Sequence, residues 1–412
     1  MPSYVEQTWI PRPEAYGPRS ARTPFVYRAF VPDRIASIRP AVAADVVGEL
    51  EAAAVEVRQL QTEPAFSGLE AASRQLLRAE ALASSRIEGL EIGHRRIATA
   101  LADGATPDET AKSVIANIRA MERAIEIASE LRVIAVDDLL AIHDTLLVLP
   151  RERSYAGRVR EEQNWIGTSS ISPRHAEFVP PPETLVPALL EDLIAFVNRD
   201  DLSPIVQAAI AHAQFESIHP FVDGNGRVGR ALIHVVLRRE NVAPRVVPPI
   251  SVILATNQSR YVEGLTSFRT GDHEGWIGFF ARALRDAATA SRSLGERIAA
   301  LEGEWQAAAR PRAGSAAETL IRRLAGSPVV SARLVQRMLD VSYPTANNAI
   351  AHLERAGVLA PVRAGWRRNR LWEAPGLLAL LDAFDAARAT PTRHDQRRRP
   401  APRAPEPGGY PT

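Results

Sequence analysis

The sequence predicts a mostly α-helical protein. Apolar side chains recur near helical spacing from Ala41 onward, as Val55, Val57 and Leu60 illustrate. The stretch 69–90 is rich in Ala, Leu, Arg and Glu, which are all strong helix formers. Segments that read as strands are short and few. These three observations favour a helical fold with minor β structure.

The predicted elements follow in chain order. Residues 1–40 are rich in proline and aromatic side chains without clear periodicity, which predicts an extended arm. Ser203 and Pro204 mark a helix start, because a capping hydroxyl precedes a proline at the first helical position. Segments 159–171 and 177–179 break the helical pattern and predict a β-hairpin. Helices are predicted at 69–90, 110–131, 136–147, 182–198, 204–217, 227–241 and 257–290.

The composition excludes several classes of protein. The 412 residues are 46% hydrophobic and 24% charged, which is typical of globular proteins. No apolar run approaches the roughly 20 residues that cross a bilayer, so no membrane partner is expected. The first residues lack the pattern of a signal peptide, and we expect a cytoplasmic protein. The absence of cysteine excludes thiolate catalysis, and Lys112, the only lysine, leaves almost all cationic chemistry to arginine.

Charge is distributed unevenly along the chain. Residues 312–386 carry ten arginines and six acids, and residues 387–412 carry six arginines and two acids. Because the whole chain has a net charge of only +2, residues 1–311 carry about −6. The basic C-terminal quarter is therefore the candidate for contact with an anionic partner.

The most informative stretch lies between two predicted helices, at residues 219–230. A helix that begins near Gly226 presents free backbone N–H groups and a partial positive charge, which suit a phosphate. Gly224 and Gly226 let the backbone approach an anion closely. Arg227 and Arg230 lie three residues apart on the helix and can contact different phosphates. The stretch therefore predicts a site for a nucleoside phosphate.

The same stretch supplies a base and a metal ligand. Asp223 offers the hard oxygen that Mg²⁺ prefers, and Mg²⁺ needs only one or two carboxylates beside phosphate oxygens. His219 has an ordinary pKa near 6.5 and can accept a hydroxyl proton at neutral pH. A glycine-rich loop between helices is usually only a turn, but a base, a metal ligand and two arginines within twelve residues point to catalysis.

This stretch resembles the signature of the Fic family, His-Pro-Phe-x-Asp-Gly-Asn-Gly-Arg-x-x-Arg, at every specified position. The resemblance implies a Fic-type helical core with a short β-hairpin flap, and transfer of AMP from ATP to a Ser, Thr or Tyr hydroxyl of a target protein or of the chain itself. It implies that His219 is the general base and that Asp223 holds Mg²⁺. The related Doc kinases carry lysine where this chain has Gly226, which favours adenylylation over phosphorylation. The residues that it assigns to nucleotide binding are Asp223, Gly224, Asn225, Gly226, Arg227, Val228, Gly229 and Arg230.

The segment Ser84-Ser85-Arg86-Ile87-Glu88-Gly89 resembles the family's inhibitory motif. The resemblance places Ser84, Glu88 and Gly89 in this motif and implies that Glu88 pairs with Arg230, which would otherwise orient the γ-phosphate. Such internal restraint is typical of class II members. In some relatives the equivalent glutamate also supports removal of AMP.

Two further positions are assigned by resemblance. Phe178 falls in the predicted flap, which can align a target segment by strand addition. Tyr261 falls where relatives carry an adenine-contacting tyrosine, but this chain has Val262 where many have a second tyrosine. A core role for Tyr261 is an equal alternative.

The C-terminal region resembles a small winged-helix domain. Residues 342–350 start its third helix, and 362–372 predict a two-stranded wing. In such a domain that helix enters the DNA major groove while the wing meets phosphates. The alternative is a docking or dimerisation domain that contacts protein. The groove-facing candidates are Tyr343, Thr345, Asn347 and Asn348, and those of the wing are Arg363, Arg367, Arg368 and Arg370.

The sequence therefore predicts five regions and one leading function. The alternatives to adenylylation are a DNA-binding regulator that senses nucleotide, and a Fic enzyme with another donor such as UTP. Relatives often dimerise, so a homodimer is allowed. The regions are an N-terminal arm and helical region at 1–131 with the inhibitory motif at 84–89, a catalytic core at 132–290, a helical end and linker at 291–314, a winged-helix-like domain at 315–386 and a disordered basic tail at 387–412.

Overall fold

The computed structural model describes residues 2–11, 23–62, 69–104, 106–130, 133–167, 171–362 and 370–386. Most of these residues are helical, so the predicted fold class is confirmed. The predicted tail at 387–412 lies outside the described residues. None of the helices within the described ranges combines the length and apolar character that a membrane span requires.

Two antiparallel neighbours, α7 (Pro204–Ile218) and α8 (Asn225–Arg239), form the centre of the molecule. Every residue of α7 after its first proline is buried. Four alanines, at 208, 209, 211 and 213, keep its surface narrow and let other helices approach closely. The flanking helices are α4 (Glu109–Glu130), α5 (Val136–Leu146) and α6 (Val186–Val197).

The helix that carries the inhibitory motif, α2 (Leu69–Ile87), packs on α4, α8 and α9 (Ile250–Thr256). A turn then leads to α3 (His94–Asp103). Single-turn 3-10 helices at Pro150–Glu152 and Glu183–Leu185 connect the elements around the core.

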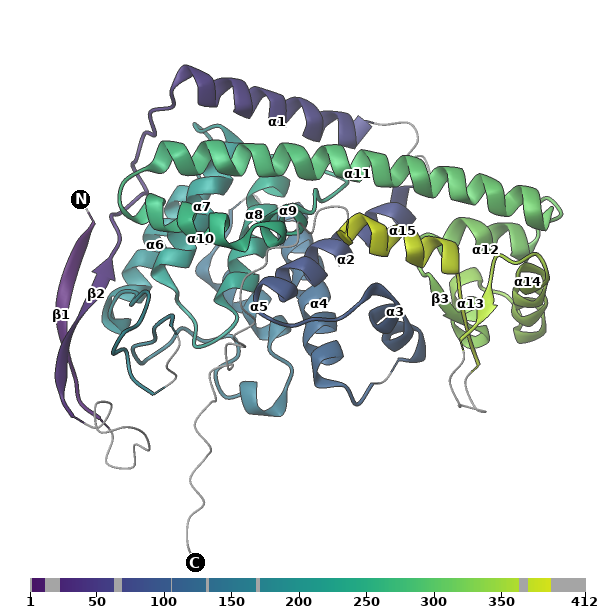
Figure 1. The fold of residues 1–412 in the computed structure, drawn as a ribbon, viewed down its shortest axis with the longest axis horizontal. Helices are drawn as coiled ribbons and strands as arrows, with labels where there is room; N and C mark the ends of the chain where they lie inside the picture. Colours follow the sequence, from purple (N-terminus) through teal and green to yellow (C-terminus); the bar gives the residue numbers. More distant parts are fainter. Residues whose placement is uncertain are drawn as a thin grey trace, which may run out of the picture.

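The longest helix, α11 (His273–Ala309), spans the molecule, with α1 (Ala44–Thr62) alongside its first half (Figure 1). The prediction of one continuous helix at 257–290 was wrong. The structure ends α10 (Gln258–Arg269) before a turn in which Gly271 has φ +101°, and Asp272 then caps α11 by accepting the Gly275 N–H at 2.8 Å. A left-handed glycine followed by a capping aspartate terminates one helix and starts another.

The N-terminal arm contains a β-ribbon that the sequence did not predict. Strand β1 (Ser3–Trp9) pairs antiparallel with β2 (Phe25–Val31), from Ser3 opposite Val31 to Trp9 opposite Phe25. The ribbon lies at one end of the molecule (Figure 1) and contacts the flap, where the Phe30 N–H donates to the Val179 carbonyl at 2.8 Å. The predicted flap hairpin is reduced to one bridge between Ile166 and Phe178 in the described residues.

The C-terminal module is defined here as residues 316–386. Its elements in order are α12 (Ala316–Leu324), β3 (Val329–Ser331), α13 (Ala332–Leu339), α14 (Tyr343–Arg355), β4 (Ala360–Pro361), β5 (Leu371–Glu373) and α15 (Pro375–Ala386).

The strands of this module form an antiparallel sheet in the order β3-β5-β4. Of the predicted wing arginines, Arg363, Arg367 and Arg368 lie outside the described residues. Arg370 pairs with Glu354 at 3.1 Å. Helix α15 returns to pack against α3 and α11, which joins the module to the rest of the molecule (Figure 1).

Candidate active site

The loop between α7 and α8 is a short, internally fixed turn. His219 ends α7 in a left-handed conformation with φ 50° and ψ 61°, and its N–H donates to the Phe215 carbonyl at 2.9 Å. Phe221 is fully buried and anchors the loop in the core. The Asn225 side chain closes the turn, because its Oδ1 accepts the Phe221 N–H and its Nδ2 donates to the Phe221 carbonyl, both at 2.8 Å. The Asn225 side chain therefore holds the loop, and its predicted part in the anion site stays a prediction.

A buried histidine of α5 packs against the loop and donates a hydrogen bond to it. The ring of His143 stacks on that of Phe221 with centroids 3.8 Å apart. The Gly157 N–H donates to Nδ1 of His143 at 3.1 Å, so Nε2 carries the proton and donates to the Asp223 carbonyl at 3.0 Å. Burial lowers the pKa of His143 to about 4, which keeps this tautomer neutral. The sequence analysis missed His143, since a single histidine in a helix carries no distinguishing pattern.

Arg160 ties the loop to the flap. Its Nε donates to the His219 carbonyl at 3.0 Å, and its backbone N–H donates to the Pro220 carbonyl at 2.9 Å. Its Nη2 donates to the Pro181 carbonyl at the end of the flap. Burial lowers the pKa of Arg160 to about 10. In the described residues its guanidinium donates to the carbonyls of His219, Glu162 and Pro181, so this cation holds the loop and places a positive charge beside His219.

The start of α8 has the features of an anion site. Gly224 precedes it in a left-handed conformation with φ +81° and donates its N–H to Oδ1 of Asp223 at 2.6 Å. The first bond within the helix runs from the Val228 N–H to the Gly224 carbonyl, so the preceding amides have no carbonyl within the helix. The Nε atom of Arg227 is buried without a hydrogen-bond partner among the described residues. Its guanidinium has only a loose ion pair with Asp223 at 3.5 Å, which leaves it available to a phosphate.

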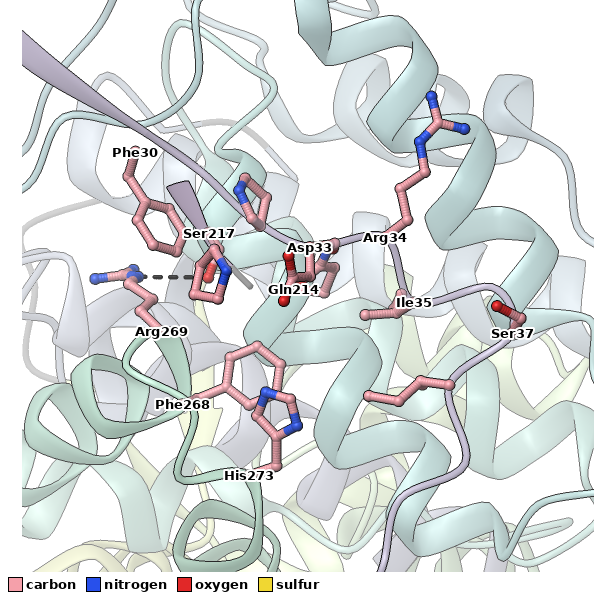
Figure 2. Close-up of a pocket in the computed structure, with 13 residues that line it drawn as sticks. Phe30, Asp33, Arg34, Ile35, Ser37, Gln214, Ser217, Phe268, Arg269 and His273 are labelled. Atoms are coloured by element: carbon pink, nitrogen blue, oxygen red, sulfur yellow. Dashed lines mark hydrogen bonds between the residues drawn. The ribbon is translucent and has the colours of Figure 1, made fainter. Parts of the chain in front are cut away.

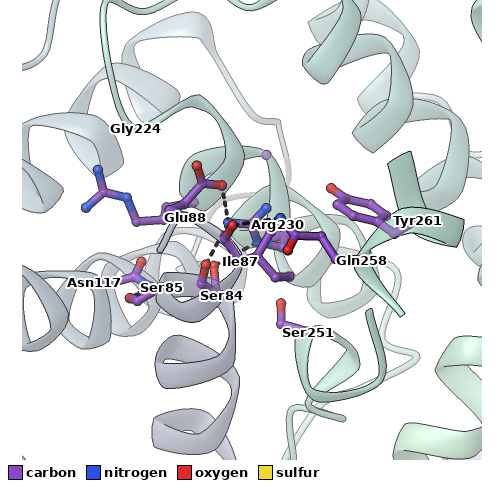
Figure 3. Close-up of polar contacts among 12 residues, drawn as sticks. Ser84, Ser85, Ile87, Glu88, Asn117, Gly224, Arg230, Ser251, Gln258 and Tyr261 are labelled. Atoms are coloured by element: carbon purple, nitrogen blue, oxygen red, sulfur yellow. Dashed lines mark hydrogen bonds and ion pairs between the residues drawn. The ribbon is translucent and has the colours of Figure 1, made fainter. Parts of the chain in front are cut away.

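The carboxylate of Glu88 forms an ion pair with the guanidinium of Arg230 (Figure 3). Nη2 of Arg230 donates to Oε1 of Glu88 and to the Ser84 carbonyl, at 2.8 and 2.9 Å, and Nε donates to Oγ of Ser84 at 2.9 Å. Burial alone raises the pKa of Glu88, but the charge and hydrogen bond of Arg230 outweigh it and hold that pKa below its ordinary value. The pair is therefore ionised at neutral pH.

Gly226 makes room for this ion pair. A Cβ atom at position 226 would overlap Oε1 of Glu88 and lie 2.9 Å from Nη1 of Arg230. Gly89, just after Glu88, has φ +82° and lets the chain turn away from α2. The structure thus brings Ser84, Glu88 and Gly89 to the start of α8, as the motif predicts, although their regulatory role stays a prediction.

The imidazole of His219 lies among cations. Burial, followed by the charges of Arg160 and Arg269, lowers the pKa of His219 to about 3. The Arg269 guanidinium stacks over the Phe178 ring at 3.7 Å, so the flap residue Phe178 lies next to this cluster. Nδ1 of His219 has no hydrogen-bond partner among the described residues. A neutral imidazole with an available nitrogen can accept a proton.

Glu216 is a buried acid that the sequence analysis did not single out. Burial raises its pKa to about 7, against the lowering effects of Arg230 and Arg269. Its carboxylate lies against Gly229, where an added Cβ would meet Oε1 at 2.5 Å. Gly229 therefore packs α8 on α7, and the side chain of Val228 is likewise buried in the core.

Tyr261 is part of the core. Its ring is only 3% exposed. Nδ1 of His212 donates to the Gly229 carbonyl at 2.8 Å, so Nε2 of His212 accepts the hydroxyl proton of Tyr261, also at 2.8 Å. This burial favours the core role over the adenine contact that the sequence left as an equal alternative.

A cavity of about 320 Å³ lies beside the site, between the N-terminal arm and α7, α10 and α11 (Figure 2). Arg269 lines one wall and donates from Nε to Oγ of Ser217 at 3.4 Å. Neither His219 nor Arg230 lines this cavity. In the described ranges no three His, Asp or Glu side chains gather in a way that could hold a metal, and the side chain of Asp223 is 40% exposed.

Comparisons with known proteins agree with this geometry. Residues 133–237 match the model of the Fic/DOC family, and residues 49–126 match that of the Fic/DOC family N-terminal region. The chain is 29% identical over 154 residues to protein adenylyltransferase fic-1 of Caenorhabditis elegans, which covers 36% of this chain and 27% of the relative. It is 32% identical over 169 residues to protein adenylyltransferase Fic of Nematostella vectensis, which covers 39% of this chain and 35% of the relative.

The chain thus spans about a third of the length of these curated relatives. Among solved structures, a Fic family protein from Desulfovibrio desulfuricans G20 superposes with a TM-score of 0.51 at 24% identity, covering 82% of this chain and 98% of the other. This likeness shows a shared fold.

Proposed function

We propose that this chain, whose residues 49–126 and 133–237 match models of the Fic/DOC family, transfers AMP from ATP to a hydroxyl group of a protein, either a target or the chain itself. One observation carries the proposal. A neutral imidazole at the end of α7, whose Nδ1 has no partner among the described residues, and two arginines in the first two turns of α8 lie on either side of a loop that is fixed by its own hydrogen bonds.

The proposed reaction needs a base and a site for charge. The oxygen of a Ser, Thr or Tyr side chain forms a bond to the α-phosphorus of ATP, and the bond from that phosphorus to the bridging oxygen breaks. Pyrophosphate leaves with the electron pair, and His219 takes the hydroxyl proton. Arg227, the amides at the start of α8 and, once Glu88 has moved, Arg230 bind the negative phosphates.

Asp223 is the residue that fits Mg²⁺. Its carboxylate is partly exposed next to the phosphate-binding helix start, and Mg²⁺ usually takes one or two carboxylates together with phosphate oxygens. When bound, Mg²⁺ neutralises charge on the phosphates. His143 contributes through its hydrogen bond to the Asp223 carbonyl, which fixes the backbone from which the Asp223 side chain extends.

The position of the radiolabel tests the function. We expect the purified chain with the Glu88→Gly substitution, supplied with Mg²⁺, to retain label from α-³²P-ATP and not from γ-³²P-ATP, because only the AMP portion is transferred. Mass spectrometry should find added AMP on a hydroxyl side chain. Label from the γ-phosphate would indicate a kinase. Stronger labelling from α-³²P-UTP would show that UTP, and not ATP, is the preferred donor.

The pH dependence tests the state of the base. His219 acts only when neutral, and a pKa of about 3 keeps it neutral throughout the range from pH 8 to pH 6. Glu88 raises this pKa, so its removal moves the pKa further down. We therefore expect kcat/KM of the Glu88→Gly variant to show no fall from His219 in this range. A histidine with an ordinary pKa of 6.5 would lose about three quarters of its neutral form by pH 6.

A carboxyl group beside the site, that of Glu216, also titrates in that range. Glu216 has a pKa near 7, raised by burial and in part by Glu88. A fall in kcat/KM that remains in Glu88→Gly but disappears in Glu88→Gly/Glu216→Gln would be assigned to Glu216. A fall with a midpoint near 6.5 that survives both substitutions would contradict the proposed protonation state of His219.

A further inference from the structure

The C-terminal module contacts the segment that carries Glu88. Arg86 lies between Ser84 and Glu88 in the inhibitory motif, and its Nη2 forms an ion pair with Oδ2 of Asp385 on α15. Nε2 of His94, the first residue of α3, lies 3.4 Å from the same oxygen. Asp385 therefore bridges both ends of the turn 88–93, which holds Glu88 and Gly89.

This bridge is built into the structure. The side chain of Asp385 is 11% exposed and that of His94 is 5% exposed. Burial alone raises the pKa of Asp385, but the hydrogen bonds and charges of His94 and Arg86 hold it below its ordinary value. A buried carboxylate that lacks its cation is costly, so Asp385 and the Arg86 guanidinium constrain each other's positions, with the His94 ring packed beside them.

Further contacts join the module to the same two helices. Nε2 of Gln75 donates to the Ala325 carbonyl and Nη1 of Arg78 donates to the Gly326 carbonyl, both at 2.8 Å, so α2 contacts the end of α12. Arg95 of α3 pairs with Glu373 of β5 at 3.1 Å. A small apolar cluster joins α3 to the module through Ala98, Ala102, Val329 and Leu378.

The position of Glu88 depends on these supports. Glu88 follows the last residue of α2, and its own side chain is 38% exposed. Because Arg230 is 1% exposed and fixed, the contact at 2.8 Å depends on where the turn places the partly exposed Glu88, so small movements of the turn loosen its hold on Arg230. Other bonds keep α2 folded if Asp385 is lost: Nδ2 of Asn117 donates to Oγ of Ser85, and Nε2 of Gln258 donates to the Ile87 carbonyl, both at 3.0 Å (Figure 3).

We propose that Asp385 is a positioning residue for Glu88, and that the C-terminal module, through Arg86 and His94, sets how strongly Glu88 restrains AMP transfer. The inference rests on the proposed function and adds a regulatory task for a module that lies outside both family matches. It requires that removing the Asp385 charge loosens the turn at 88–93 while the structure of the loop at 219–224 is kept.

The test compares Asp385→Asn in two backgrounds of the full chain. In the otherwise unchanged chain, we expect the rate of self-labelling by α-³²P-ATP to rise about three- to tenfold, which is less than the loss of a whole charged hydrogen bond, because Asp385 acts on Glu88 only through the turn. In the Glu88→Gly background, the same substitution should leave the rate within about twofold, because no restraint remains to be loosened. Asp385→Glu keeps the charge and should stay close to the parent. Asp382→Asn, on an exposed position of α15, is the matched control.

Hydrogen exchange supplies a readout that does not depend on activity. We expect Asp385→Asn to speed amide exchange in residues 84–92 while residues 219–230 stay protected. Unchanged exchange in 84–92, or an equal change of labelling in both backgrounds, would overturn the positioning role. If Glu88→Gly itself shows no labelling, the proposed function fails, and the exchange result still decides whether Asp385 holds the turn.

Discussion

Replacing Glu88 with glycine is expected to raise the rate of AMP transfer by about 10- to 100-fold. The carboxylate of Glu88 occupies Nη2 of Arg230 at 2.8 Å, and this arginine is 1% exposed, so it cannot turn to water for another partner. A hydrogen bond to a charged group contributes about 1.5–3 kcal/mol, which corresponds to this range of rates. Removing the carboxylate also removes a negative charge that repels triphosphate oxygens.

The measurement is the initial rate of incorporation from α-³²P-ATP, compared at equal protein concentration. Glu88→Gln separates charge from shape, because the amide keeps the size of the side chain and can still accept a hydrogen bond; an intermediate rate is expected. Glu91→Gln is the matched control, since Glu91 is an exposed acid three residues further along and this substitution removes its charge without giving the turn new backbone freedom. Equal rates for Glu88→Gly and the unchanged chain would show that Glu88 exerts no restraint.

The shape of the loop at 219–224 could be predicted from the sequence because its interactions are local. Asn225 binds the backbone of Phe221 four residues earlier, and Gly224 donates to the adjacent Asp223. The helix start that follows is fixed by the left-handed glycine. Residue types at short spacing therefore contain nearly all the information that shapes this turn.

The supports of the loop could not be predicted, because they come from distant parts of the chain. His143 lies 80 residues before the Asp223 carbonyl that it binds, and Arg160 lies 59 residues before His219. Neither has a local pattern that separates it from an ordinary helix or surface residue. The contact of Asp385 with Arg86, 299 residues away, is a stronger case of the same limit.

The β-ribbon was missed for a related reason. Strands β1 and β2 each have only seven residues, and their pairing depends on a partner more than fifteen residues away. The break between α10 and α11 was missed although it has local signals, namely Gly271 and the capping Asp272. Helical periodicity on both sides of that turn outweighed those two signals.

Substituting His219 in the Glu88→Gly background is expected to lower AMP transfer by about 10²- to 10⁴-fold, the usual contribution of a general base. The fall should appear in kcat, with ATP affinity changed by less than about threefold, because Arg227, Arg230 and the amides of α8 remain in place. Phosphate binding by these groups does not require the imidazole, whose Nδ1 lacks a partner in the described residues.

Two variants distinguish the loss of the base from a loss of the folded structure. His219→Ala removes the ring, whereas His219→Asn keeps a polar side chain that cannot accept a proton at neutral pH; both should lose activity to a similar extent. His219 adopts a left-handed conformation with φ 50°, which asparagine tolerates better than alanine, so His219→Asn should have the higher melting temperature of the two. Calorimetric titration with ATP then measures binding by the inactive protein. If His219→Asn retained transfer within about fivefold of the Glu88→Gly parent, another group would have to take the hydroxyl proton, and Glu216, with its pKa near 7, would be the next residue to replace.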